Sequence, residues 1–180
     1  MTKYVFSKCG DADLEAIAAL VNSAYRGESS KAGWTTEADI LGGQRTDAAT
    51  LRENLGDGTQ KVILCARDRD SGELVASVWL DRVEDSRGPG CHLGMLTVKP
   101  TLQTGGLGKL LMKEAEAFAQ KTWGASWMTL EVIQLRTELM AWYERRGYKK
   151  TGVIKPFPMN DPRFGIPKVE LQLVVFEKKL

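Results

Sequence analysis

A cluster of glycines marks the segment of this chain whose residue types point most directly to chemistry. Three glycines fall within four residues in the run Gln103-Thr104-Gly105-Gly106-Leu107-Gly108-Lys109, which joins a predicted strand to a predicted helix. Glycine has no Cβ, so the backbone can adopt unusual dihedral angles there and approach a ligand closely. The first N–H groups of a helix lack partners and carry partial positive charge. The turn therefore predicts a site for a phosphate or pyrophosphate, against the alternative of a glycine-rich turn without a ligand.

Two other phosphate-binding motifs are excluded by the spacing of this turn. A dinucleotide-binding fingerprint requires a glycine three residues after Gly108, where this chain has Leu111. A P-loop requires Ser or Thr after the Gly-Lys pair, where this chain has Leu110, and an earlier glycine where it has Gln103.

The turn and its preceding strand resemble the coenzyme A pyrophosphate loop of the GNAT acetyltransferase superfamily. The matching pattern is Gln103-x-x-Gly106-x-Gly108 after a strand that ends Leu96-Thr97-Val98, and the order of elements matches along nearly the whole chain. The resemblance implies acetyl-CoA as the cofactor, with its pyrophosphate at the turn and its pantetheine arm along the strand. The residues implied to bind it are Leu96, Thr97, Val98, Gln103, Thr104, Gly105, Gly106, Leu107, Gly108 and Lys109.

A second match lies downstream, where a predicted helix ends in Tyr143-x-x-x-Gly147-Tyr148. It resembles the GNAT signature in which the tyrosine hydrogen-bonds the cofactor sulfur, and it implies Tyr143 as the catalytic acid. Attack of an amine on a thioester expels a thiolate, which a nearby O–H can protonate as it leaves. Leu135, Leu139 and Tyr143 also repeat at helical spacing, so a packed core aromatic is the alternative.

The same resemblance assigns two further positions. Arg136 stands where many members have an Asn that contacts the pantetheine; it is expected to bond the cofactor, at a phosphate, or else to be a solvated helix start. His92 stands where some members have a Glu that deprotonates the amine, and a histidine pKa near ~6.5 suits a base. Glu131, a water relay or an amine that arrives neutral are the alternatives. The N–H of Leu96 is the implied polariser of the thioester carbonyl.

These residues need a sheet and helices to position them. Apolar periodicity predicts strands over residues 4–8, 61–67, 74–81, 91–98, 127–133, 148–154 and 169–176. It predicts helices over 11–25, 47–55, 106–122 and 136–146, and Gly and Pro predict a turn over 84–90. The order β-α-α-β-β-β-α-β-α-β-β indicates the α/β class: a single-domain, GNAT-like mixed and largely antiparallel sheet flanked by helices, spanning residues 1–180.

The family resemblance places the acceptor amine between two long loops, residues 26–46 and 155–168. Both loops mix acidic, basic and aromatic side chains: Trp34, Glu37, Asp39, Arg45, Phe157, Asp161, Arg163 and Phe164. Carboxylates beside aromatics suit a cationic amine, whereas arginines suit an amine that also bears a carboxylate. The mixture selects neither.

The expected function is acetyl-CoA-dependent N-acetylation of a primary amine, carried by a small molecule, by direct attack on the thioester. One alternative is a coenzyme-A-binding sensor or interaction module with weak or no catalysis, which would not need a proton donor such as Tyr143. Another is a protein-lysine acetyltransferase, which requires an open groove rather than the covered pocket that the four prolines within 155–168 suggest.

Composition excludes several other classes of partner. The 25 Lys and Arg against 23 Asp and Glu give a net charge of +2, too low to indicate a nucleic-acid partner. No run approaches ~18 apolar residues and the first residues lack a secretory signal, so no membrane partner is expected and the expected location is cytoplasmic. Three widely spaced cysteines form no disulfide framework, and a single histidine offers too few ligands for a metal site. A homodimer is left open.

Overall fold

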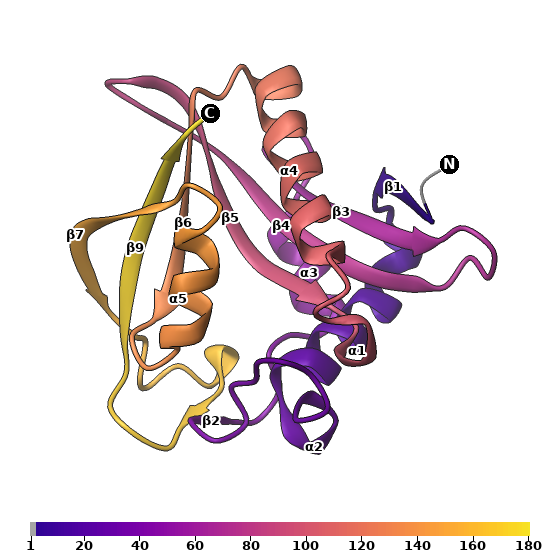
Figure 1. The fold of residues 1–180 in the computed structure, drawn as a ribbon, viewed down its shortest axis with the longest axis vertical. Helices are drawn as coiled ribbons and strands as arrows, with labels where there is room; N and C mark the ends of the chain where they lie inside the picture. The colour runs from indigo at the N-terminus through magenta and orange to yellow at the C-terminus, as the bar shows by residue number, and fades with distance from the viewer. Residues whose placement is uncertain (1–2) are drawn as a thin grey trace.

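The structure, a computed structural model, describes residues 3–180 and is built around a seven-stranded sheet. Its strands follow the order β1-β3-β4-β5-β6-β9-β7 (Figure 1). Their bounds are β1 (Tyr4–Lys8), β3 (Lys61–Asp68), β4 (Leu74–Asp85), β5 (Gly88–Val98), β6 (Trp127–Ile133), β7 (Lys149–Pro156) and β9 (Gln172–Lys179). Within the described residues, only β5 and β6 run parallel in this sheet. The predicted mixed, largely antiparallel sheet is therefore confirmed.

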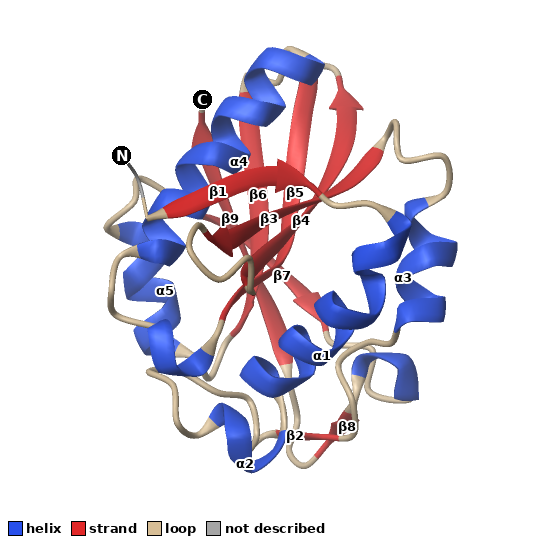
Figure 2. Ribbon diagram, turned by 90° about the vertical axis from the view of Figure 1, so that its right-hand side faces the viewer, coloured by secondary structure: helices blue, strands red, loops and turns tan. Residues whose placement is uncertain are grey.

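Helices cover both faces of this sheet. They are α1 (Leu14–Tyr25), α2 (Gly27–Ser30), α3 (Ala48–Leu55), α4 (Leu107–Trp123) and α5 (Thr137–Glu144). Strand β3 shows how the faces are divided: Val62 and Leu64 pack with residues of α4 and α5, whereas Ile63 and Cys65 pack with residues of α1 and α3. Because successive strand residues point to opposite faces, the two pairs of helices lie on opposite sides of the sheet (Figure 2).

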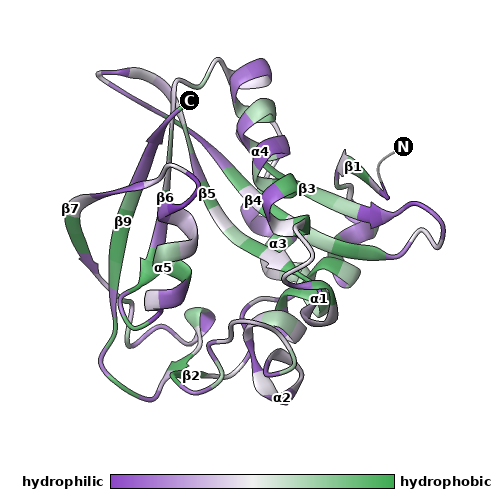
Figure 3. Ribbon diagram, in the orientation of Figure 1, coloured by the Kyte–Doolittle hydropathy of each residue, from purple (hydrophilic) through white to green (hydrophobic). Residues whose placement is uncertain are grey.

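Helix α4 is held against the sheet by one apolar stripe. Leu107, Leu111, Ala115 and Ala119 recur every four residues and are all buried. Burying a leucine side chain contributes roughly 1.5–3 kcal/mol, so the stripe fixes the helix and the turn that begins it. Figure 3 shows the same division, with hydrophobic residues through the central strands and hydrophilic residues at the far end of the β4–β5 hairpin.

The turn predicted over residues 84–90 is wrong in extent. Strand β4 continues to Asp85 and β5 already begins at Gly88, so the hairpin is longer and its turn much tighter. The glycine that suggests a turn has another use here, because a Cβ at Gly90 would overlap the indole of Trp127 on β6. The residue serves packing between two strands rather than a change of chain direction.

The two long loops contain short elements that the sequence patterns do not predict. Strands β2 (Leu41–Gly42) and β8 (Ile166–Pro167) pair antiparallel and so join the loops to each other. A strand of two residues has no periodicity to detect, so only the folded chain reveals the pairing. The last strand begins at Gln172, later than predicted. None of the helices within residues 3–180 is long and apolar enough to cross a membrane.

Replacing Gly90 by Ala is expected to destabilise the fold by about 1–3 kcal/mol, because the new Cβ would overlap the Trp127 indole. At this chain length the change corresponds to a fall in Tm of about 2–12 °C. The matched control is Gly94→Ala on the same strand, where a Cβ would meet no atom within 4 Å. Equal melting temperatures for the two variants would contradict the packing described here.

Candidate active site

The sheet opens between its two parallel strands. β5 and β6 pair only where Cys91, His92 and Leu93 face β6, and beyond that point they separate (Figure 1). On its other edge, β5 is bulged against β4, and Met95 there has a φ of 45°. The later part of β5 therefore presents backbone N–H and C=O groups that lack a strand partner on the β6 side. Such groups require another partner when they are buried.

Side chains satisfy part of this open edge. The hydroxyl of Tyr25 donates to the carbonyl of Leu96 at 2.9 Å, and Nε2 of Gln103 donates to the carbonyl of Val98 at 3.2 Å. The hydroxyl of Thr97 turns back to the Met95 carbonyl at 2.9 Å. The predicted strand Leu96–Val98 thus lies at the opening, but two of its carbonyls already have partners.

The glycine-rich turn leads into α4 with two residues of positive φ. Thr104 has a φ of 70° and Gly106 a φ of 84°, and the first backbone bond of the helix runs from the N–H of Leu110 to the carbonyl of Gly106 at 3.1 Å. The N–H groups of the first turn therefore precede any helical acceptor, as a phosphate site requires. Gly108 also lies against the Trp142 ring, which a Cβ there would approach to 3.4 Å, and its predicted close approach to a ligand stays a prediction.

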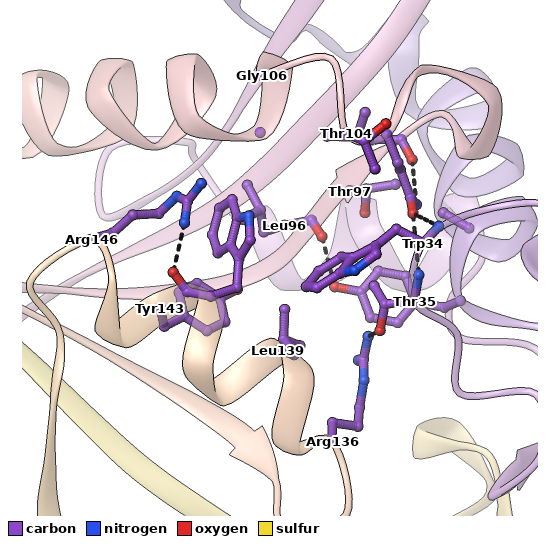
Figure 4. A pocket seen from close by; sticks show the side chains of 16 residues that line it. Trp34, Thr35, Leu96, Thr97, Thr104, Gly106, Arg136, Leu139, Tyr143 and Arg146 are labelled. Carbon is purple, nitrogen blue, oxygen red and sulfur yellow. Dashed lines mark hydrogen bonds between the residues drawn. The ribbon is translucent and has the colours of Figure 1, made fainter.

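The side chain of Gln103 connects the turn to the loop of residues 26–46. Its Oε1 accepts from the backbone N–H of Trp34 at 2.6 Å and from that of Thr35 at 3.4 Å (Figure 4). The glutamine at the head of the turn therefore fixes the loop beside it. Gly33 makes room for this contact, since a Cβ there would clash with the Gln103 amide.

A cavity of about 160 Å³ lies between the turn, β5 and α5 (Figure 4). The predicted cofactor residues that line it are Leu96, Thr97, Val98, Gln103, Thr104, Gly106, Gly108 and Arg136. Gly105, Leu107 and Lys109 are not among its lining residues: the Leu107 side chain is buried in the core, and the Lys109 side chain is exposed. Leu107 could contact a ligand only through its backbone N–H group. Lys109 could do so through its backbone N–H group or its exposed ammonium group.

Tyr143 also lines this cavity, and its side chain is only 6% exposed. Within residues 3–180, no group hydrogen-bonds its hydroxyl, while its ring packs edge-on against Trp142 at 5.1 Å and Tyr148 at 6.0 Å. Burial raises the pKa of Tyr143, so the phenol stays protonated at working pH. The residue is both a packed aromatic and an O–H donor with no partner.

A second cavity, of about 260 Å³, meets the first at the opening of the sheet. Both cavities are lined by Tyr25, Leu96, Arg136, Leu139 and Tyr143. The second one extends between the two long loops, as predicted for the acceptor. The loop residues that line it are Arg26, Glu37, Leu41, Arg45, Phe157, Pro158 and Phe164. Of the other predicted loop residues, Trp34 lines the first cavity, Asp39 lines neither of the two, and Asp161 and Arg163 pair with each other at the surface.

Both candidate bases line the second cavity. Nδ1 of His92 lies 3.2 Å from Oγ1 of Thr129, and burial lowers the pKa of His92, although the Glu131 and Asp81 carboxylates oppose that shift. His92 is therefore neutral at working pH and able to accept a proton. The Glu131 carboxylate lies 2.6 Å from Nζ of Lys155 and already forms an ion pair with that ammonium group.

Arg136 belongs to a buried charge network that the sequence does not reveal. Its Nη1 is 2.7 Å from Oε1 of Glu37, and its Nη2 donates to Oγ1 of Thr35 at 2.9 Å. The other oxygen of Glu37 accepts from Arg26, whose Nη2 also donates to the carbonyl of Phe164 at 3.2 Å. The Arg136 side chain is only 8% exposed, so the solvated alternative is wrong. Its contact with a cofactor phosphate stays a prediction.

Tyr25 and Glu37 are the residues at this site that sequence reasoning missed or undervalued. Tyr25 ends α1 four residues after Val21, on the apolar face of the helix, so its pattern is that of a core residue. No sequence signal distinguishes the two roles. Across the part of the chain that the structure describes, no three His, Cys, Asp or Glu side chains gather as metal ligands.

Comparison with known proteins defines the class. The chain matches the model of the acetyltransferase (GNAT) family over residues 15–148. A nourseothricin acetyltransferase shares the fold, with 20% identity, 99% of each chain covered and a TM-score of 0.68. The ribosomal-protein-S18-alanine N-acetyltransferase from Escherichia coli gives 18% identity, 98% and 93% coverage and a TM-score of 0.68. The structure of yncA from Salmonella typhimurium with acetyl-CoA gives 17% identity, 99% and 95% coverage and a TM-score of 0.67.

No curated protein sequence matches this chain significantly. The family match and the fold define a transferase of acyl groups. The chain belongs to the GNAT acetyltransferase family, whose members use acetyl-CoA as the donor.

Replacing Gly106 by Ala is expected to raise the dissociation constant of coenzyme A about 5- to 30-fold. An alanine is strained by roughly 1–2 kcal/mol at the positive φ of Gly106, so the free turn would relax and binding would have to restore it. Gly105→Ala is the matched control, because Gly105 has no positive φ and its Cβ would be in ordinary contact. Calorimetric titration that finds equal affinities for both variants would contradict the role given to the turn.

Proposed function

We propose that this protein is an acetyl-CoA-dependent N-acetyltransferase that acetylates the primary amine of a small molecule by direct attack on the thioester. The observation that carries the proposal is the junction of two cavities at the opening between β5 and β6. One cavity adjoins the phosphate-type turn, the other lies between the two loops, and both are lined by Tyr143, whose hydroxyl has no hydrogen-bond partner among residues 3–180.

The residues around the first cavity fit coenzyme A. The N–H groups that begin α4 suit a pyrophosphate, and glycine at position 106 permits the positive φ with which the turn enters the helix. The open edge of β5 from Leu96 to Val98 has two of its carbonyls bonded by Tyr25 and Gln103, and its remaining backbone groups on the β6 side, which no described strand pairs, suit the amides of a pantetheine arm. Bound there, acetyl-CoA supplies an acetyl group activated as a thioester. A backbone N–H near Leu96 is proposed to polarise its carbonyl, a contribution of roughly 3 kcal/mol in acyl transfer.

His92 is proposed as the group that receives the proton of the attacking amine. Burial keeps its imidazole neutral, and it lines the second cavity, where the acceptor is proposed to bind. Glu131 is less suitable because its carboxylate already pairs with Lys155. A water relay remains the alternative.

Tyr143 is proposed as the acid that protonates the departing thiolate. The carbon–nitrogen bond forms as the carbon–sulfur bond breaks, and the sulfur takes the phenolic proton. The proton that His92 gained returns to solvent, and solvent restores the proton of Tyr143. The raised pKa of Tyr143 keeps the donor protonated before each turnover.

The covered second cavity favours a small acceptor over a protein lysine. The β2–β8 pairing joins the two loops, and Nζ of Lys168 donates to the Ala38 carbonyl at 2.6 Å.

We further propose that residues 1–180 form one catalytic domain. We propose that it works in the cytoplasm, because Cys9, Cys65 and Cys91 are free thiols, as in a reducing compartment.

Acetyl-CoA is expected to stabilise the protein. A ligand at ~100 times its dissociation constant adds about 2.7 kcal/mol, which raises the Tm by about 5–10 °C at this chain length. Differential scanning fluorimetry with millimolar acetyl-CoA, followed by an amine screen for thiol release, measures both parts of the proposal. A protein that unfolds at the same temperature with and without acetyl-CoA would overturn it.

Tyr143→Phe is expected to lower kcat about 10²- to 10⁴-fold while acetyl-CoA affinity stays near that of wild type. The phenylalanine ring still packs against Trp142 and Tyr148, so only the proton donor is lost. The matched control is Tyr148→Phe, whose hydroxyl bonds Glu116 on α4 at 3.0 Å rather than lining either cavity. Comparable kcat for Tyr143→Phe and wild type under rate-limiting chemistry would make Tyr143 a core residue only.

A further inference from the structure

The second cavity has more positive than negative charge. Its ionised lining residues include Arg26, Arg45 and Arg136 against the carboxylates of Glu37 and Glu131. Both carboxylates already form ion pairs with cationic side chains.

Each oxygen of Glu37 holds one guanidinium, that of Arg26 or that of Arg136. Glu131 holds Lys155 from the neighbouring strand β7. No carboxylate in this lining is therefore free to bind the second ammonium group of an acceptor that carries two amines.

Arg45 is the cation in this lining without a counterion. Within the described residues, no carboxylate lies within ion-pair distance of its guanidinium, which sits 5.8 Å from the centre of the Tyr25 ring. The side chain of Tyr25 also faces Arg136, at the same distance of 5.8 Å. Arg45 is therefore held at the part of the cavity nearest the junction residue Tyr25.

The backbone at Arg45 and Thr46 is fixed by the side chain of Asn22. The N–H of Arg45 donates to Oδ1 of Asn22 on α1 at 2.6 Å, and Nδ2 of Asn22 donates to the carbonyl of Thr46 at 2.8 Å. Two residues later, Asp47 caps α3 by accepting from the N–H of Thr50 at 2.7 Å. A charged side chain on an anchored backbone loses less freedom when it binds a ligand.

We infer that the acceptor is a primary amine that also carries a carboxylate, as amino acids do, and that Arg45 binds that carboxylate. A guanidinium binds a carboxylate through two parallel hydrogen bonds, which suits an unpaired arginine beside a buried network. The excess positive charge also disfavours the ammonium form of the bound amine and so favours the reactive neutral form. The inference rests on the proposed function and deepens it by naming the substrate class.

The test compares matched acceptors by thiol release from acetyl-CoA: amino acids with α- or ω-carboxylates, the carboxamides of the same amino acids, and aliphatic diamines. We expect kcat/KM for the carboxylates to exceed that for the carboxamides at least tenfold, although a carboxamide makes its amine less basic and hence more often neutral. Diamines should be poor acceptors. Better turnover of carboxamides or diamines than of carboxylates would overturn the inference and leave the proposed function intact.

The variant Arg45→Gln assigns the preference to this side chain. Loss of a charge-assisted pair should lower kcat/KM for carboxylate acceptors about ten- to hundredfold and bring it close to that for the carboxamides. Arg45→Lys should restore part of the preference. Arg52→Gln is the matched control, since Arg52 pairs with Asp11 at the exposed surface of α3. An unchanged carboxylate preference in Arg45→Gln would overturn the assignment.

Thermal stabilisation by acetyl-CoA separates the two levels of the proposal. Wild type and Arg45→Gln should both be stabilised, because Arg45 does not line the first cavity. If neither is stabilised and no amine releases thiol, the proposed function fails and this inference fails with it.

Discussion

The separation of β5 from β6 is the constraint on which the rest of the structure depends. Breaking a sheet in its interior exposes backbone groups that cost free energy unless something else bonds them. Side chains from other elements bond two of these groups: Tyr25 donates to the carbonyl of Leu96, and Gln103 donates to that of Val98. The positive φ of Met95 bulges the strand away from its other neighbour as well. The opening is thus sustained by specific bonds, and it brings the two cavities into contact.

Glu37 organises the elements around that opening. Its two oxygens hold guanidiniums from the end of α1 and the start of α5, and the same arginines reach Thr35 and the carbonyl of Phe164. A buried ion network is stable only when its charges are paired and hydrogen-bonded, so removing the carboxylate would leave two buried cations unpaired. The network therefore fixes both loops against α5. It also leaves the cavity positive, because one carboxylate serves two arginines.

The sequence was informative where the signal is local. The bounds of β6 and the apolar stripe of α4 follow from periodicity, and the glycine-rich turn follows from residue type. The partners of Tyr25 and Glu37 do not follow from the sequence, because they are distant along the chain. Tyr25 bonds a residue 71 positions away, and Glu37 bonds a residue 99 positions away. Periodicity reports which face a residue occupies and not which distant group it meets. Gly90 shows that residue type can also mislead. The glycine is typical of a turn, but in the folded chain it makes room for the Trp127 indole.

The charge of the site and the burial of its proton-transfer groups act in the same direction. Positive side chains around the cavity proposed for the acceptor would disfavour its ammonium form, and burial disfavours the charged forms of His92 and of Tyr143 alike. An amine that arrives neutral needs a base only once it has begun to form the new bond, and a neutral imidazole suffices for that proton. A protonated phenol is likewise ready for the sulfur that leaves. In the proposed mechanism the arginines would therefore favour the neutral reactant, and His92 and Tyr143 would each transfer one proton at opposite ends of the reacting group.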